Sequence, residues 1–219
     1  MRFSGLAALT GVSSPVFFLL ALLATRAARA DPAPAPVPPL NARERYRTPI
    51  AGSETYWQGF GSLSLGKGLR FNNPYRLASQ LGDTPESLSL SATYYDLGLG
   101  LVHGPARGLS HGAAVHLSIA AQGVPQEVLS LSYTALERLD GGRTVLFARA
   151  GIPVILEPDL SGGLEAAMGA AYLITAGIGV QSELIGSLFY GAATPQSSVS
   201  TIPMLSLQLG LFVAYEVLP

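Results

Sequence analysis

The sequence predicts an all-β fold, a closed antiparallel up-and-down transmembrane β-barrel of about eight strands. Its C-terminal segment alternates apolar Leu205, Leu207, Leu209, Leu211, Val213, Tyr215 and Val217 with Ser206, Gln208, Gly210, Phe212, Ala214 and Glu216. The chain also begins with a secretory signal, and only 12% of its residues are charged. No apolar run after that signal reaches the length of about 20 residues that a membrane helix requires. Low charge without a membrane helix leaves a closed barrel as the natural membrane fold.

The alternation in residues 205–217 indicates the closing strand of this barrel. A period of two places every second side chain on the same face of a strand. A water-exposed edge strand with one long apolar face would aggregate. A strand that crosses a bilayer needs about 9–11 residues with apolar groups facing outward. We therefore expect Leu207, Leu209, Leu211 and Val213 to point away from the barrel interior.

The N-terminal residues predict export. Arg2 precedes an apolar stretch from about Leu6 to Ala24, and Ala28-Arg29-Ala30 is a small-x-small cleavage pattern. We expect a signal peptide over residues 1–30, cleaved near Ala30, with an uncleaved anchor as the alternative. Cleavage would remove three of the 13 basic residues and leave 10 against 14 acidic ones, a net charge of −4. That charge gives no electrostatic basis for nucleic-acid binding.

Composition changes twice along the mature chain. Residues 31–55 begin with alternating Pro and Ala and continue with a polar tail. Such a segment favours polyproline II and cannot build a core, so we predict a periplasmic spacer. Residues 56–219 consist of short alternating segments separated by Gly, Pro, Asn and Asp, and form the predicted barrel. The absence of cysteine excludes disulfides and thiolate metal sites.

Seven alternating segments precede the closing strand, at about 57–71, 87–101, 111–122, 128–137, 143–155, 164–174 and 178–190. The second changes phase at Tyr94 and Tyr95, which predicts a β-bulge. The sixth contains good helix formers at 164–168, but the nearby glycines and the alternation of the seventh favour strands. An even strand number places both ends of a bacterial barrel in the periplasm and the longer connections outside.

With this organisation, residues 56–219 resemble the small eight-stranded outer-membrane barrels of the OmpA/OmpX type. The C-terminal assembly signal of that family has a polar residue, then Gly two places on, then hydrophobic or aromatic residues at the sixth and eighth positions. Gln208, Gly210, Val213 and Tyr215 fill those places. The resemblance implies recognition by the barrel insertion machinery. It further implies residence in the outer membrane of a Gram-negative bacterium, in contact with outer-membrane lipid and lipopolysaccharide.

Charged residues on the less apolar faces are candidates for a lumen network. Arg143, Arg149, Glu165, Glu183 and Glu216 fall on those faces, as does His116. An eight-stranded barrel has room for little beyond its own side chains, and charges in so narrow a space must pair or be hydrated. The hypothesis is a plugged interior in which Arg149 pairs with Glu165 or Glu183. A proton or ion path is the rival interpretation.

The predicted function is a structural or surface-interaction role, without cofactor, metal site or catalytic residues. A passage barrel for small or hydrophobic solutes is one alternative. Another is a lipid A-modifying hydrolase, in which His116 would act with Ser118 or Ser132, although serine is so frequent on the polar faces that a neighbouring histidine is expected by chance. A third is a soluble secreted β-barrel that binds an apolar ligand. The sequence specifies neither the ligand nor the oligomeric state.

Overall fold

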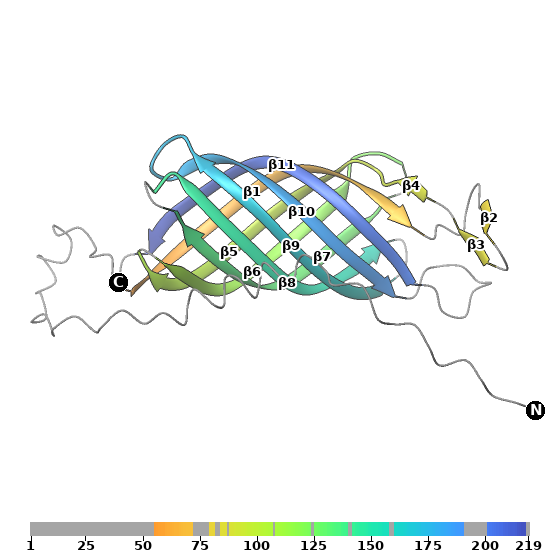
Figure 1. Ribbon diagram of the computed structural model, residues 1–219, viewed down its shortest axis with the longest axis horizontal. Helices are drawn as coiled ribbons and strands as arrows, with labels where there is room; N and C mark the ends of the chain where they lie inside the picture. Colours follow the sequence, from red (N-terminus) through yellow and green to blue (C-terminus); the bar gives the residue numbers. More distant parts are fainter. Residues whose placement is uncertain are drawn as a thin grey trace, which may run out of the picture. The chain divides into compact units, whose positions relative to one another are not determined.

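The computed structural model describes residues 55–71, 79–81, 84–86, 88–106, 108–123, 125–139, 142–157, 160–190 and 201–217. The predicted signal peptide 1–30 and nearly all of the spacer 31–55 lie outside these ranges and stay predictions. Of the spacer, Thr55 alone is described, and it is the first residue of strand β1. Every regular element in the described ranges is a β-strand (Figure 1).

Eight long strands form the main sheet. They are β1 (Thr55–Phe71), β5 (Tyr94–Pro105), β6 (Leu109–Ala120), β7 (Glu127–Arg138), β8 (Thr144–Glu157), β9 (Ser161–Leu173), β10 (Ile178–Tyr190) and β11 (Thr201–Val217). Each pairs antiparallel with its neighbours in the chain, and β11 also pairs with β1. That last pairing closes the sheet, so the predicted all-β closed antiparallel barrel is confirmed.

Three short strands lie between β1 and β5. β4 (Leu88–Leu90) pairs with the end of β1, while β2 (Ser79–Leu81) and β3 (Thr84–Glu86) pair with each other. Between the pairs Gly66–Tyr94 and Leu69–Leu90, two residues of β1 lie opposite three residues, 91–93. The extra residue is a bulge, which shifts the side-chain phase where the sequence predicted a phase change.

Strand stagger sets the dimensions of the barrel. Following the pairing from Gly59 through each neighbouring strand in turn leads back to β1 at Leu69, ten residues further along. For eight strands at ordinary spacing, this stagger corresponds to a tilt of about 40° and a backbone radius of roughly 8 Å. The tilt is visible in Figure 1. A barrel of this radius is just wide enough for its interior side chains to fill it.

The segment with helix-forming residues is a strand in the structure. Residues 164–168 lie within β9, which pairs with β8 on one side and β10 on the other. Ladder hydrogen bonds on both edges outweigh a local helix propensity of a few tenths of a kcal/mol per residue. The preference for strands over a helix is therefore confirmed.

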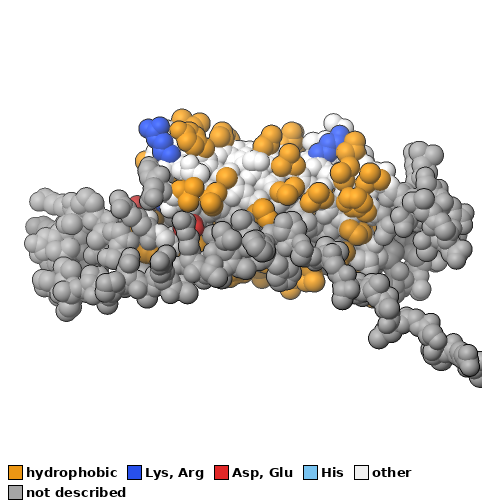
Figure 2. Space-filling model, viewed as in Figure 1, with side chains coloured by type: hydrophobic (Ala, Val, Ile, Leu, Met, Phe, Trp, Pro, Cys, Tyr) orange, Lys and Arg blue, Asp and Glu red, His pale blue; other side chains and the backbone are white. Residues whose placement is uncertain are grey.

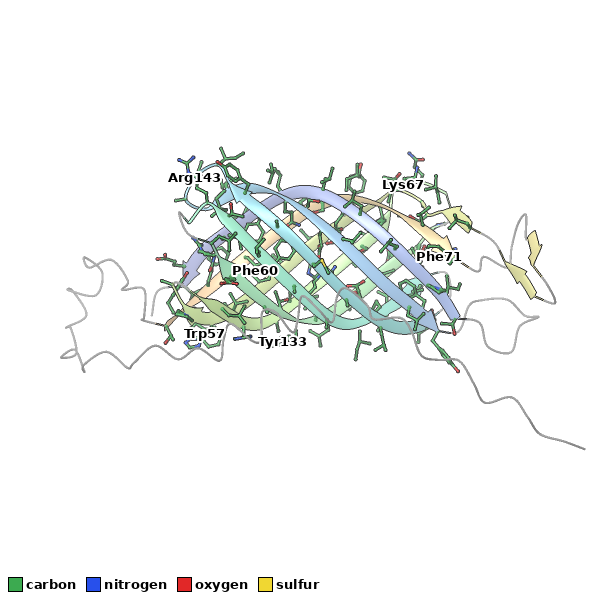
Figure 3. All side chains as sticks on the ribbon, in the orientation of Figure 1. Trp57, Phe60, Lys67, Phe71, Tyr133 and Arg143 are labelled. Atoms are coloured by element: carbon green, nitrogen blue, oxygen red, sulfur yellow. The ribbon has the colours of Figure 1, made fainter. Side chains whose placement is uncertain are left out.

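The outer surface of the barrel is apolar. In β11, Leu207 is 52% exposed, Leu209 59%, Leu211 53% and Val213 42%, while Gln208 between them is fully buried. Figure 2 shows hydrophobic side chains over the visible surface between basic groups at its two ends. Figure 3 identifies basic residues at opposite ends as Arg143 and Lys67. This inside-out distribution suits a hydrocarbon surrounding. Within the described residues no helix is long and apolar enough to cross a bilayer.

The two ends of the barrel differ in the length of their connections, and we call them the turn end and the loop end. At the turn end, short segments join β5 to β6, β7 to β8 and β9 to β10. The first residue of β1 and the last residue of β11 also lie at this end. At the loop end, longer segments join β1 to β5 and β10 to β11, with shorter ones between β6 and β7 and between β8 and β9. The predicted asymmetry between the two sets of connections is therefore present.

Candidate functional site

An apolar layer fills the lumen near the turn end. Phe60, Phe147 and Phe212 stack there, with ring centroids 6.0 Å apart for Phe60 and Phe212 and 6.3 Å apart for Phe147 and Phe212. Figure 3 shows Phe60 inside the barrel toward the end that carries Trp57 and Arg143. Smaller buried residues complete the layer: Val102, Ala114, Leu136, Val145, Ala171, Leu173 and Ala214. Stacked rings and aliphatic groups leave little space for water at this level.

An ion-pair network lies above the apolar layer, toward the loop end. Arg149 on β8 is 3% exposed, and its Nε donates to Glu183 Oε1 at 2.6 Å. Its Nη1 donates to Glu165 on β9, and Gln208 Nε2 on β11 donates to the second oxygen of Glu183. One guanidinium thus serves two carboxylates, and an amide supports one of them. Buried charges persist where they are paired and hydrogen-bonded in this way.

A second polar cluster lies on β5 and β6. His116 Nδ1 is 2.9 Å from Asp96 Oδ1, and Ser118 Oγ donates to Asp96 Oδ2 at 2.6 Å. His116 and Asp96 are 5% and 1% exposed. Gly98 lies beside His116 in the pairing, and a Cβ at Gly98 would come within 2.7 Å of the imidazole Cε1. Glycine at this position leaves the space that the imidazole fills.

Two further hydrogen bonds extend these clusters around the barrel wall. Gln181 Nε2 donates to Ser64 Oγ at 2.9 Å, and Ser187 Oγ donates to Glu165 Oε2 at 3.3 Å. The first bond joins β10 to β1 across β11, and the second joins β10 to β9. Side-chain hydrogen bonds thus connect the lumen faces of β9, β10 and β1.

The structure brings together three of the six residues predicted for the lumen network. Arg149, Glu165 and Glu183 are in direct contact, and His116 contacts Asp96 instead. Arg143 and Glu216 do not join them, because both are exposed. Arg143 lies just before the first residue of β8, and Glu216 is the penultimate residue of β11. Both have the alternation of lumen residues, but at the turn end they lie beyond the enclosed part of the barrel.

The four residues of the predicted assembly signal divide between the two faces of β11. Gln208 and Gly210 are on the lumen side, whereas Val213 and Tyr215 are outward, at 42% and 58% exposure. Gln208 thus has a structural role in the Glu183 contact in addition to its place in the motif. Recognition by insertion machinery stays a prediction.

A cavity of about 70 Å³ occupies the half of the lumen nearest the loop end. Its lining includes Asp96, His116, Arg149 and Glu165. Below the ion pairs, the next void measures only about 10 Å³ and is walled partly by Phe60, Phe147 and Phe212. One water molecule needs about 10–15 Å³ on this scale. The upper cavity has room for several small groups, and the lumen narrows below it to about the size of one.

Neither of the two predicted serine partners of His116 is hydrogen-bonded to it. The His116–Asp96 contact resembles the orienting half of a catalytic triad. Ser118 Oγ donates to Asp96, however, and Ser132 Oγ donates to the Ala114 carbonyl at 3.3 Å. Neither hydroxyl of the predicted candidates is directed at the imidazole. Among the described residues, no group of three or more His, Cys, Asp or Glu side chains is arranged to hold a metal ion.

Sequence reasoning missed Asp96 and the role of the three phenylalanines. Asp96 has the alternation of a lumen residue after the bulge, on the same face as Gly98 and Gly100, and that was the available signal. Phe212 and Phe147 were on the less apolar faces, but the sequence does not show that they meet Phe60. Their meeting depends on strand stagger, which local alternation does not encode.

Neither a protein-family model nor a curated protein matches the sequence. Solved structures with a similar fold include the N-terminal β-barrel domain of Pseudomonas aeruginosa OprF, at 13% identity and a TM-score of 0.46, covering 73% of this chain and 98% of that one. Ail, the attachment invasion locus protein of Yersinia pestis, gives 9% identity and a TM-score of 0.45, covering 72% and 99%. The outer-membrane protein AlkL gives 10% identity and a TM-score of 0.45, covering 87% and 98%.

The assignment of the fold rests on the architecture of the sheet. The sheet closes with eight long antiparallel strands and a stagger of ten residues. Its outer surface is apolar, and its lumen holds buried charged residues. In these respects the chain has the fold of the small eight-stranded outer-membrane barrels of the OmpA/OmpX type.

Proposed function

We propose that this protein is an integral outer-membrane barrel with a structural or surface-interaction role and a lumen closed to solutes. The main support for the proposal is that two consecutive layers of side chains block the passage of solutes through the lumen. The Arg149 network spans the middle, and the stack of Phe60, Phe147 and Phe212 lies beneath it. An ion would have to leave water and pass both barriers.

The closed wall supports the same conclusion for apolar solutes. Fourteen residue pairs join β1 to β11, from Trp57–Val217 to Arg70–Met204. This pairing leaves no lateral gap at the seam between the described parts of these strands. A non-enzymatic role is supported by the hydrogen bonds of Ser118 and Ser132, which direct both hydroxyls away from His116.

The proposed orientation has the loop end outside the cell and the turn end in the periplasm. The first residue of β1 and the last residue of β11 lie at the turn end. This agrees with an exported chain whose N-terminal spacer lies in the periplasm. The apolar belt would contact outer-membrane lipid and lipopolysaccharide. The motif containing Gly210 and Val213 would be presented to the barrel insertion machinery before the strand is sealed.

Planar-bilayer recording tests the closed lumen. Refolded protein should show no large, stable conductance steps, since the apolar layer and the ion pairs exclude a continuous water column. A variant with Phe60→Ala and Phe212→Ala, which removes two rings of the stack, provides the matched comparison and should raise the frequency of brief openings. Folding of both proteins is verified by the change in electrophoretic mobility on heating. Stable steps from the unaltered protein would refute the proposal.

Cell fractionation tests the location separately. The protein should sediment with outer membranes and require detergent for release, because its exposed surface is apolar. Recovery in the soluble periplasmic fraction without detergent would contradict the membrane assignment and favour the soluble ligand-binding alternative.

A further inference from the structure

The cavity at the loop end has two chemically different walls. Its lower part is polar and includes Asp96, Arg149 and Glu165. Its upper part includes Ile185 and Phe189, which are buried on the lumen face and are apolar, together with Val128 and Met204. A filler side chain could have occupied this volume, as phenylalanines do nearer the turn end. The cavity instead combines an ionic floor with an apolar collar, as small-molecule sites commonly do.

The floor has an excess of negative charge. Among the described residues, Arg149 is the only guanidinium that lines the cavity, and it contacts two carboxylates, Glu165 and Glu183. Asp96 is a third carboxylate, paired with His116. Three carboxylates therefore contact only one guanidinium and one imidazole. A buried carboxylate in excess needs a proton or a cation.

An amide behind the floor supports one of these carboxylates without lining the cavity itself. Gln208 is fully buried, and its Nε2 donates to Glu183, but its Oε1 has no hydrogen-bond partner among the described residues. The unsatisfied group of this network is thus an acceptor. Arg70, a basic residue further toward the loop end, does not line the cavity. A ligand that carries positive charge would complement the excess of carboxylates on the floor.

We propose that this cavity binds a small organic monocation, an ammonium group bearing a short alkyl chain. The ammonium would lie against Asp96 and Glu165, within reach of the aromatic ring of Tyr94. The alkyl chain would lie against Ile185, Phe189 and Met204. A volume of about 70 Å³ corresponds to about five to seven water-sized groups, and n-butylammonium has five non-hydrogen atoms. Entry would be from the loop end, because the apolar layer closes the other end.

Methionine-methyl NMR on the refolded chain in a non-ionic detergent provides the test. The sequence contains three methionines. Met204 lines the cavity, whereas Met168 lies on β9 outside it and serves as an internal control. Titration with n-butylammonium should shift the Met204 methyl resonance saturably, with a dissociation constant of about 1 mM for so small a ligand, and leave Met168 unmoved. n-Butanol, which matches the ligand without the charge, should bind at least tenfold more weakly.

Variants locate the binding determinant. Glu165→Gln should weaken n-butylammonium binding at least fivefold, and the matched change Glu157→Gln, at an exposed residue, should leave it within twofold. Should Glu165→Gln fail to fold, Ala120→Phe fills the cavity without touching a charge and should abolish the Met204 shift. An equal response to butanol would show an apolar void only, and an equal response to sodium would show an unselective cation site. Either result, or an unmoved Met204 resonance, would overturn the proposal, while conductance measurements test the closed lumen independently.

Discussion

Replacement of Arg149 by methionine tests whether the lumen network determines the stability of the barrel. The substitution keeps most of the side-chain length and removes only the charge and the donors. It leaves Glu165 and Glu183, with side chains 9% and 1% exposed, without the cation that both contact. We expect the variant to fold less stably than any variant altered at the barrel surface.

The magnitude follows from the geometry. Unit charges about 4 Å apart interact by about 4 kcal/mol at an effective dielectric constant of about 20. Measured losses on removing one partner of a buried ion pair are about 3–5 kcal/mol. Because the two carboxylates share a single guanidinium, we expect one loss of about 4 kcal/mol in the free energy of unfolding rather than twice that amount.

Urea unfolding in phospholipid vesicles, followed by tryptophan fluorescence of Trp57, measures this free energy. Arg143→Met provides the matched control, since Arg143 is exposed, and should change stability by less than about 0.5 kcal/mol. A double variant with Glu183→Gln should recover about 1–3 kcal/mol of the loss, because the uncompensated charge is removed as well. Equal stability of the Arg149→Met and Arg143→Met proteins would refute this account of the network.

Three further substitutions address the outer wall and the lumen packing, with the same unfolding assay. Leu209→Arg places a charge on the lipid-facing surface and should cost about 2–4 kcal/mol, whereas Lys67→Gln near the loop end should be nearly neutral; an equal effect of the two would argue against a membrane surface. Phe212→Ala removes the ring at the centre of the aromatic stack and should cost about 3–5 kcal/mol. In Gly98→Val the new side chain would collide with Ser62 and the imidazole of His116, and the free energy of unfolding should fall by about 1–3 kcal/mol. An unchanged stability would show that the neighbouring side chains can move aside without loss of packing.

Strand positions were largely predictable because alternation is a local property. The seventh predicted segment, 178–190, coincides with β10 from Ile178 to Tyr190. The phase change at Tyr94 and Tyr95 located the bulge between β4 and β5. Outward and inward faces follow from the same alternation, since a strand with one apolar face has only one orientation that suits a membrane. The signal peptide, its cleavage near Ala30 and the periplasmic spacer were not tested by the described residues.

The site was predictable by residue type but only partly by partner. Arg149, Glu165 and Glu183 were candidates because their charges fell on the less apolar faces, and the structure places them in contact. Arg143 and Glu216 had the same face and the same chemistry, yet they lie outside the enclosed lumen. Height along the barrel axis separates the two groups. That height depends on the register of each strand with its neighbours, and the alternation of faces along one strand does not determine the register.

The sequence by itself determined that the chain would form strands with an apolar outer face and a less apolar inner face, because both properties follow from the period-two pattern of each segment. Only the tertiary structure decided the stagger of ten residues and, through it, which side chains share a level of the lumen. Stagger accumulates over eight strand pairings and is fixed when β11 meets β1. For that reason Phe60 stacks on Phe212, and Arg149 reaches Glu183, 34 residues away in the chain.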